Sequence, residues 1–167
     1  MHSERFKEEV VPLQSSLYRF ANAMLHDRQE AEDVVQEIFV RLWSKRDSLT
    51  GVNNLKAFAF KMTKNLCLDK IKLRKQGISE IEKSKLQVAS FNPHEMAEIK
   101  DMATVVQSIM KFLPEQQRLL IQLRNIEELS FEEIEEITAM SVNAIRVTLS
   151  RARKTINEIY QQHFNHG

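Results

Sequence analysis

The stretch Ser130–Lys154, SFEEIEEITAMSVNAIRVTLSRARK, predicts two short helices joined by a tight turn. Ser130 can cap the first helix, and Glu133 completes a capping box. The apolar pattern stops near Ala139, and Ser141 is a new N-cap candidate. The first helix is acidic and the second is basic. The basic helix presents a short row of groups that can bond base edges and phosphates, as the second helix of a helix-turn-helix does in the DNA major groove.

The second of these helices has two distinct faces. Its apolar stripe, with a 3.6-residue period, consists of Val142, Ile145, Leu149, Ala152 and Ile156. The opposite face, which can bond to base edges and phosphates, consists of Asn143, Arg146, Val147, Ser150, Arg151 and Lys154. Helix signals alone also allow ordinary packing with a solvated basic face, so they leave both interpretations open.

The composition of the whole chain predicts an all-α protein. Its 167 residues are enough for one or two small domains, and three glycines and three prolines leave few helix breakers. No apolar run reaches the length of a membrane span, and the charged start MHSERFKEEVV contains no signal-peptide core. Cys67 is the only cysteine, which fits a reducing compartment. We therefore expect a cytoplasmic protein without membrane insertion.

Basic residues are clustered although the net charge is only +1. Residues 54–75 contain seven basic and one acidic residue, and residues 141–167 contain four and one. The rest of the chain is net acidic. Two basic segments separated by acidic surface suggest two footprints on a polyanion, with the acidic parts available to a basic protein.

Three helical segments are expected in the N-terminal half. Residues 4–25 form the first, which Pro12 kinks or splits because it lacks a backbone N–H. Asp27 and Glu30 begin the second, EAEDVVQEIFVRLWSK, at residues 30–45. Its inner face consists of Ala31, Val34, Val35, Ile38, Phe39 and Leu42, and its outer face of Asp33, Gln36, Glu37 and Arg41. A polar loop over residues 44–54 then leads to one helix over residues 55–76.

The helix over residues 55–76 is expected to be apolar on one side and basic on the other. The apolar side consists of Leu55, Phe58, Ala59, Met62, Leu66 and Leu73. The basic half consists of Lys56, Phe60, Lys61, Lys64, Lys72, Arg74 and Lys75. An aromatic ring among cations can stack on an unpaired base, so Phe60 is a candidate for that contact. Packing of Phe60 on a neighbouring helix is the alternative.

The remaining segments complete a division into domains at residues 1–75 and 99–167, with a linker at residues 76–98. The linker loses periodicity and contains the breaker pair Asn92-Pro93. Residues 99–124 predict one or two helices, which break at Leu113-Pro114. We find no nucleophile–base pair, phosphate loop or metal-ligand cluster, and therefore expect no enzymatic activity, cofactor or metal.

Several strings, taken together and in order, resemble the extracytoplasmic function (ECF) sigma factors of the sigma-70 family. Residues 129–134 (LSFEEI) and 150–156 (SRARKTI), with the upstream LPEQQR at residues 113–118, resemble region 4. Residues 32–37 (EDVVQE) are similar to region 2.2, and residues 57–75, including NLCLD, to regions 2.3–2.4. The resemblance covers nearly all of residues 10–75 and 105–156.

The resemblance implies two helical domains, the second with a helix-turn-helix, that bind core RNA polymerase and direct it to promoters. The residues implied to bind the polymerase β′ clamp are Asp33, Gln36, Glu37 and Arg41. Those implied to hold the −10 non-template strand are Lys56, Phe60, Lys61, Lys64 and Asn65, with a flipped base in the loop at about residues 49–54. Those implied to read −35 duplex are Asn143, Arg146, Val147, Ser150, Arg151 and Lys154. Further partners would be the polymerase β flap and an anti-sigma factor.

The chain departs from the family pattern at two positions of the helix-turn-helix. Ala139 stands where a turn glycine is customary, which suggests a turn that avoids positive φ. Thr148 stands where an arginine is often found, so no promoter sequence is carried over. Two other functions remain as alternatives. A dimeric helix-turn-helix repressor would need a self-complementary interface, for which no heptad exists, and a protein-only adaptor would leave both basic helices unexplained.

Overall fold

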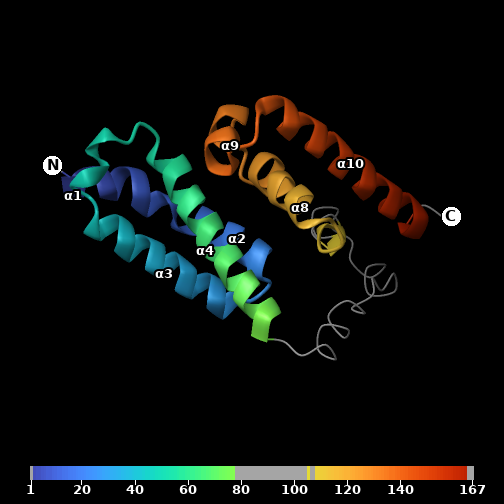
Figure 1. Ribbon diagram of the computed structural model, residues 1–167, viewed down its shortest axis with the longest axis horizontal. Coiled ribbons are helices and arrows are strands. Elements are labelled where there is room, and N and C mark those ends of the chain that lie inside the picture. The colour runs from blue at the N-terminus through green and yellow to red at the C-terminus, as the bar shows by residue number, and fades with distance from the viewer. Residues whose placement is uncertain (1, 78–104, 106–107, 165–167) are drawn as a thin grey trace. The chain divides into compact units, whose positions relative to one another are not determined.

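A computed structural model describes residues 2–77, 105 and 108–164, and all regular elements in these residues are helical (Figure 1). The predicted all-α class is therefore confirmed. The chain forms two compact units, one made of residues 1–77 and 122–141 and the other of residues 78–121 and 142–167. The predicted linker lies, apart from its first two residues, outside the described residues. No described helix is both long and apolar enough to cross a bilayer.

The N-terminal segment changes helix type at Pro12. α1 (His2–Arg5) continues into the π-helix η1 (Phe6–Val10) and the 3-10 turn η2 (Val11–Leu13), and α2 (Gln14–Leu25) follows. The predicted split is confirmed, because proline lacks the N–H that an uninterrupted α-helix requires. α2 ends at His26, which has a φ of 54° and donates its N–H to the Asn22 carbonyl at 2.8 Å.

The next helix, α3 (Arg28–Ser44), begins as the sequence predicts. The Glu30 N–H donates to the Asp27 side chain at 3.0 Å, which caps the helix. The predicted inner face is confirmed, since five of its residues are buried and Phe39 is half-buried; the five are Ala31, Val34, Val35, Ile38 and Leu42. A short 3-10 helix, η3 (Ser48–Gly51), lies in the loop that follows.

α4 (Leu55–Gly77) is one long helix, as predicted, and packs against α2, α3, η1 and α9 (Figure 1). Its buried residues are Leu55, Ala57, Ala59, Phe60, Thr63 and Cys67. The predicted apolar side is partly wrong, because Phe58 and Met62 are only half-buried and Leu73 is 66% exposed. Burial of the Cys67 side chain raises the pKa of its thiol to about 12, against a smaller opposing effect of the Lys70 charge.

The first unit also contains η4 (Gln122–Ile126) and α9 (Phe131–Thr138). The predicted capping box is confirmed: the Glu133 N–H donates to Ser130 Oγ, and the Ser130 N–H donates to the Glu133 carboxylate, both at 3.0 Å. The Glu127 carboxylate is buried and accepts from the Arg19 guanidinium at 2.6 and 2.7 Å. Gln122 Nε2 donates to the same carboxylate at 3.1 Å. This buried acid is therefore paired and hydrogen-bonded, as burial of a charge requires.

The turn after α9 corrects one expectation. Ala139 has a φ of 61°, in the left-handed region, and its N–H donates to the Glu135 carbonyl at 2.8 Å. The expectation that alanine at this position avoids positive φ is wrong. The left-handed residue gives the last turn of α9 a hydrogen bond to one of its free carbonyls, which offsets the steric cost of the Cβ.

The second unit is built on α8 (Glu115–Ile121) and α10 (Val142–Phe164), which pack together. α8 begins directly after Pro114, so the predicted break is confirmed. In α10 the predicted stripe is also confirmed, with Ile145, Leu149 and Ala152 buried and both ends half-buried. Val105 and Ile109 pack with the C-terminal part of this helix, at Ile156, Ile159 and Tyr160. Most of the segment before Ser108 lies outside the described residues.

Candidate nucleic-acid and protein interfaces

The outer face of α10 is exposed to solvent. All six predicted side chains are exposed: Asn143, Arg146, Val147, Ser150, Arg151 and Lys154. From Arg146 to Lys154 the face extends about 12 Å, because an α-helix rises about 1.5 Å per residue. A row of this length with amide and guanidinium groups near its start and cations further along can contact base edges and phosphates together. The structure thus leaves this face open for a ligand.

The basic half of α4 is only partly accessible. Lys61 and Asn65 are exposed, whereas Lys56 and Lys64 are half-buried. Lys64 Nζ donates to the Ile137 carbonyl in the last turn of α9, at 2.8 Å. Burial and the nearby charge of Lys61 lower the pKa of the Lys64 ammonium. Two of the four predicted polar side chains on this helix are therefore well exposed in this conformation.

Phe60 does not lie on the basic half of α4, and this expectation is wrong. Its side chain is fully buried, and its ring packs edge-on against Phe20 with centroids 5.5 Å apart and an interplanar angle of 67°. The alternative left open by the sequence, packing on a neighbouring helix, describes what is observed. Phe60, Thr63 and Cys67 follow one another at helical spacing and are all buried. These residues form a second buried line on α4, which lies beside the apolar stripe predicted from the sequence.

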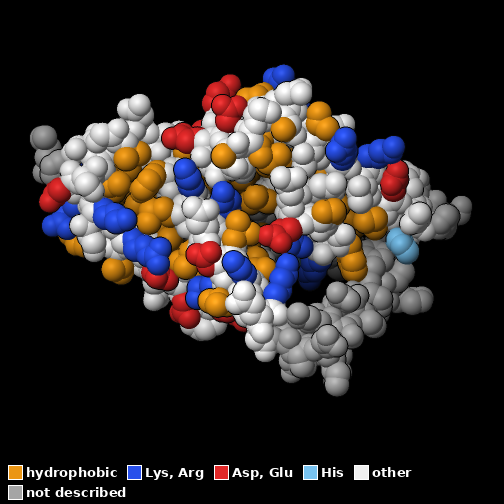
Figure 2. All heavy atoms as spheres, in the orientation of Figure 1, with side chains coloured by type: hydrophobic (Ala, Val, Ile, Leu, Met, Phe, Trp, Pro, Cys, Tyr) orange, Lys and Arg blue, Asp and Glu red, His pale blue; other side chains and the backbone are white. Residues whose placement is uncertain are grey.

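The outer face of α3 combines polar and apolar groups. All four predicted residues are exposed, and Arg41 Nη2 pairs with Glu37 Oε1 at 2.6 Å. Gln29 Nε2 also donates to the Asp33 carboxylate at 3.2 Å. Val40 is 64% exposed and follows Gln36 and Glu37 at helical spacing, so it belongs to the same surface. Val40 is not among the residues predicted from the sequence to form this face. Figure 2 shows such hydrophobic side chains at the surface among charged ones.

The capping residues of α9 and the start of α4 are joined by polar contacts within the first unit. Asn54 Oδ1 accepts the Ala57 N–H at 2.9 Å, and Asn54 Nδ2 donates to Glu133 at 3.2 Å. Burial alone would raise the pKa of the Glu133 carboxyl, but hydrogen bonds from Ser130 and Asn54 and the charge of Lys56 outweigh it and lower the pKa. Glu133 is therefore held in its ionised form.

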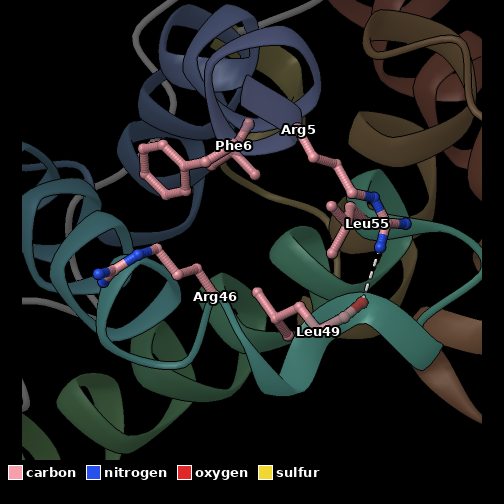
Figure 3. A pocket seen from close by; sticks show the side chains of 6 residues that line it. Arg5, Phe6, Arg46, Leu49 and Leu55 are labelled. Carbon is pink, nitrogen blue, oxygen red and sulfur yellow. Dashed lines mark hydrogen bonds between the residues drawn. The ribbon is translucent and has the colours of Figure 1, made fainter. Parts of the chain in front are cut away.

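The loop between α3 and α4 borders a small hollow rather than a pocket for a base. The hollow has a volume of about 10 Å³, and its lining consists of Arg5, Phe6, Val10, Arg46, Leu49 and Leu55 (Figure 3). That space is roughly the size of one water molecule. Within the loop, Thr50, Gly51 and Asn53 are exposed, whereas Leu49 is buried. Any base held here must therefore contact the outer side of the loop or change its shape.

The part of the chain that the structure describes contains no cluster of side chains that could bind a metal ion. No three His, Cys, Asp or Glu side chains in residues 2–77, 105 and 108–164 come close enough together to hold an ion. The candidate surfaces described above are the basic faces of α4 and α10, the loop before α4 and the mixed face of α3.

Comparison with known protein families finds two matches along the chain. Residues 10–77 match sigma-70 region 2, and residues 105–156 match sigma-70 region 4. The ECF RNA polymerase sigma factor SigW of Bacillus subtilis is 24% identical, over 93% of this chain and 88% of the relative. SigM of the same organism is 27% identical, over 90% of this chain and 92% of the relative.

Solved structures give the same result for the fold. The sigma factor RpoE from Bartonella quintana, solved with the anti-sigma factor NepR, matches with a TM-score of 0.72 and 25% identity, covering 93% of this chain and 96% of the other. CnrH, solved with the cytosolic domain of CnrY, matches with a TM-score of 0.69. CnrH shares only 21% identity over 96% of this chain and 90% of its own, so that match bears on the fold alone.

Proposed function

Since this chain belongs to the ECF sigma factors of the sigma-70 family, we propose that it binds core RNA polymerase and directs it to particular promoters through −10 and −35 DNA. The observation that carries this proposal is the ordered match to regions 2 and 4 in a single chain. Two modest binding sites joined by a linker gain effective affinity, because the second binding event becomes intramolecular.

At the −35 element, α10 reads duplex DNA with its outer face. Residues near the start of a recognition helix reach deepest into the major groove, so Asn143 and Arg146 read bases. By bidentate geometry, asparagine suits adenine and arginine suits guanine, and exposed Val147 suits a thymine methyl group. Arg151 and Lys154 lie further along the helix and hold phosphates, which carry little sequence information.

At the −10 element, α4 and the loop before it hold the unpaired non-template strand. Unstacking a base costs a few kcal/mol, which contacts with the protein must offset. Lys61 and Asn65 are exposed and can contact the strand directly, and Lys56 is half-exposed. Lys64 exchanges its bond with the Ile137 carbonyl for a phosphate. Because Phe60 is buried, its part in this process is to hold α4 on α2, and the loop at residues 49–54 supplies the contacts to the base.

The polymerase contact uses the mixed face of α3. Asp33 and Glu37 pair with cations on the β′ clamp, and Gln36 and Arg41 add hydrogen bonds. Val40 supplies apolar area next to them. The Glu37–Arg41 pair within α3 is exposed and worth only about 0.3–0.5 kcal/mol, so it exchanges readily for partners on the polymerase. The β flap binds the C-terminal domain.

An anti-sigma factor is a further proposed partner, and the cytoplasm is the proposed location. The support for this partner is that the sigma factor RpoE from Bartonella quintana was solved in complex with the anti-sigma factor NepR.

The test is reconstituted transcription with purified chain and core polymerase. The chain should direct initiation from a subset of a promoter library, and the variant carrying Asp33→Lys and Glu37→Lys should lose most of its affinity for core. A matched control carries Glu4→Lys and Glu8→Lys, which reverse two exposed charges in α1 and η1. Equal core affinity in all three proteins would refute the α3 interface. Sequence-specific binding to duplex DNA by a dimer without core would instead support a free-standing regulator.

A further inference from the structure

We propose that Arg5 is a positioning residue for the loop at residues 49–54. Its side chain holds this loop in the conformation that contacts −10 DNA. This inference rests on the proposed function of that loop. Region 2 begins to match at residue 10, so Arg5 lies before the matched segment. Its guanidinium nevertheless reaches residues 44 and 47 positions further along the chain.

The Arg5 side chain donates hydrogen bonds to two backbone carbonyls of the loop. Nη1 donates to the Leu49 carbonyl at 2.8 Å, and Nη2 donates to the Val52 carbonyl at 2.7 Å (Figure 3 shows the first bond). Its Nε pairs with the Glu9 carboxylate on the same helical segment. A planar guanidinium holds its donors in a fixed fork, so the two carbonyls are held at one separation and orientation.

The bonded carbonyls lie at the two ends of the tight turn in this loop. The Val52 N–H donates to the Leu49 carbonyl at 3.0 Å, so that carbonyl accepts from both the backbone and Arg5. Between these residues lie Thr50 and Gly51, and Asn53 follows; all three are exposed. The buried, bonded side of the turn therefore determines where its exposed side points.

The helical segment that carries Arg5 is itself anchored on α3. The Phe6 ring packs edge-on against Trp43, with centroids 5.1 Å apart, and against Phe39 at 6.1 Å. At the start of the loop, the Arg46 guanidinium lies 4.1 Å from the centre of the Trp43 ring and donates to the Trp43 carbonyl at 2.9 Å. The N-terminal segment therefore braces the loop against the end of α3. Without Arg5, the Leu49 and Val52 carbonyls lose their hydrogen bonds to this support.

The experiment compares wild type, Arg5→Ala, Arg5→Lys and Lys7→Ala in transcription from libraries randomised in the −10 or the −35 element. Arg5→Ala should reduce discrimination among −10 sequences by roughly five- to tenfold, the scale expected for two lost charge-assisted hydrogen bonds that are partly exposed. Its ranking of −35 sequences should stay unchanged. Arg5→Lys should be intermediate, because an ammonium keeps the charge without the fork. Lys7→Ala removes an exposed positive charge two residues away and should match wild type.

A purely structural role would lower transcription from every promoter without changing the −10 ranking, and that outcome overturns the proposal. So does a −10 profile of Arg5→Ala that matches wild type. Hydrogen exchange over residues 48–54 of the free chain provides a second measurement that needs no polymerase. Arg5→Ala should speed exchange there, and unchanged protection overturns the proposal. If wild type fails to initiate transcription although Arg5→Ala speeds exchange, the stabilisation of the loop by Arg5 is supported and the proposed function is refuted.

Discussion

α4 and α10 are both 23-residue helices rich in lysine and arginine, yet they are built into the protein differently. α4 packs against α2, α3, η1 and α9, and it buries an aromatic ring, a threonine and a cysteine. α10 packs against α8, and every polar position of its outer face is exposed. α4 therefore supports the core and can offer DNA only a narrow strip, whereas α10 offers a complete face.

This difference determines what mutations can reveal. A substitution on α4 can change folding and DNA binding together, because the same helix carries core and surface residues. On the outer face of α10 the two effects separate, since removal of an exposed side chain usually changes stability by less than about 0.5 kcal/mol. The two helices therefore need different controls.

The largest expected effect is that of Phe60→Ala on stability. Removing a fully buried phenylalanine ring leaves a cavity and should reduce the free energy of unfolding by about 3–5 kcal/mol, measured by urea denaturation. Val147→Ala on α10, which truncates a half-exposed side chain, is the control and should change it little.

Permanganate reactivity of −10 thymines completes this test of α4. If Phe60→Ala leaves stability unchanged, but fails to melt duplex promoters and is rescued on pre-melted templates, the ring stacks on a base after all. The contrast between the two helices would then be lost.

A smaller effect is expected from Arg146→Ala on α10. Loss of a bidentate contact to a base should reduce discrimination at one or two −35 positions by about 1–3 kcal/mol, with stability unchanged. Transcription from a −35 substitution library measures this. An equal decrease at every promoter, with no change in rank, would mean that α10 is positioned differently on DNA.

Lys154→Ala should act more weakly and without regard to sequence. A lost phosphate contact should weaken binding to all promoters alike and reduce the slope of log affinity against log salt concentration by about one unit. Titrations at several salt concentrations with polymerase bound give the slope. A change in base preference with an unaltered slope would assign Lys154 to base reading.

The smallest effect is expected from Leu73→Ser near the end of α4. Because this side chain is 66% exposed, the substitution should change the free energy of unfolding by less than about 0.5 kcal/mol. Denaturation beside Phe60→Ala provides the measurement. A loss of several kcal/mol would show that Leu73 is covered in solution and that the single apolar side predicted from sequence is correct.

Local patterns predicted the parts of the fold that local interactions determine. The cap at Ser130, the inner face of α3 and the stripe of α10 depend on one packed side or on neighbours in sequence. The burial of Phe60 depends on α2, and the burial of Glu127 depends on Arg19, 108 residues away, so no local period contains either. Ala139 adopts a conformation that its residue type disfavours, because its N–H bonds to the end of α9. Of the candidate surfaces, exposed Val40 was missed because apolar residues are assigned to the core by default.

The rate at which a reagent labels Cys67 can report how often α4 opens locally. It is the only cysteine in the sequence, and its side chain is buried in the middle of α4. Because the thiol is buried, an alkylating reagent can reach its reactive thiolate form only when local opening exposes Cys67 to solvent. The labelling rate, divided by that of an unprotected thiol, gives the equilibrium constant for opening. Repeated with core polymerase bound, the same measurement gives the free energy by which binding suppresses opening of α4.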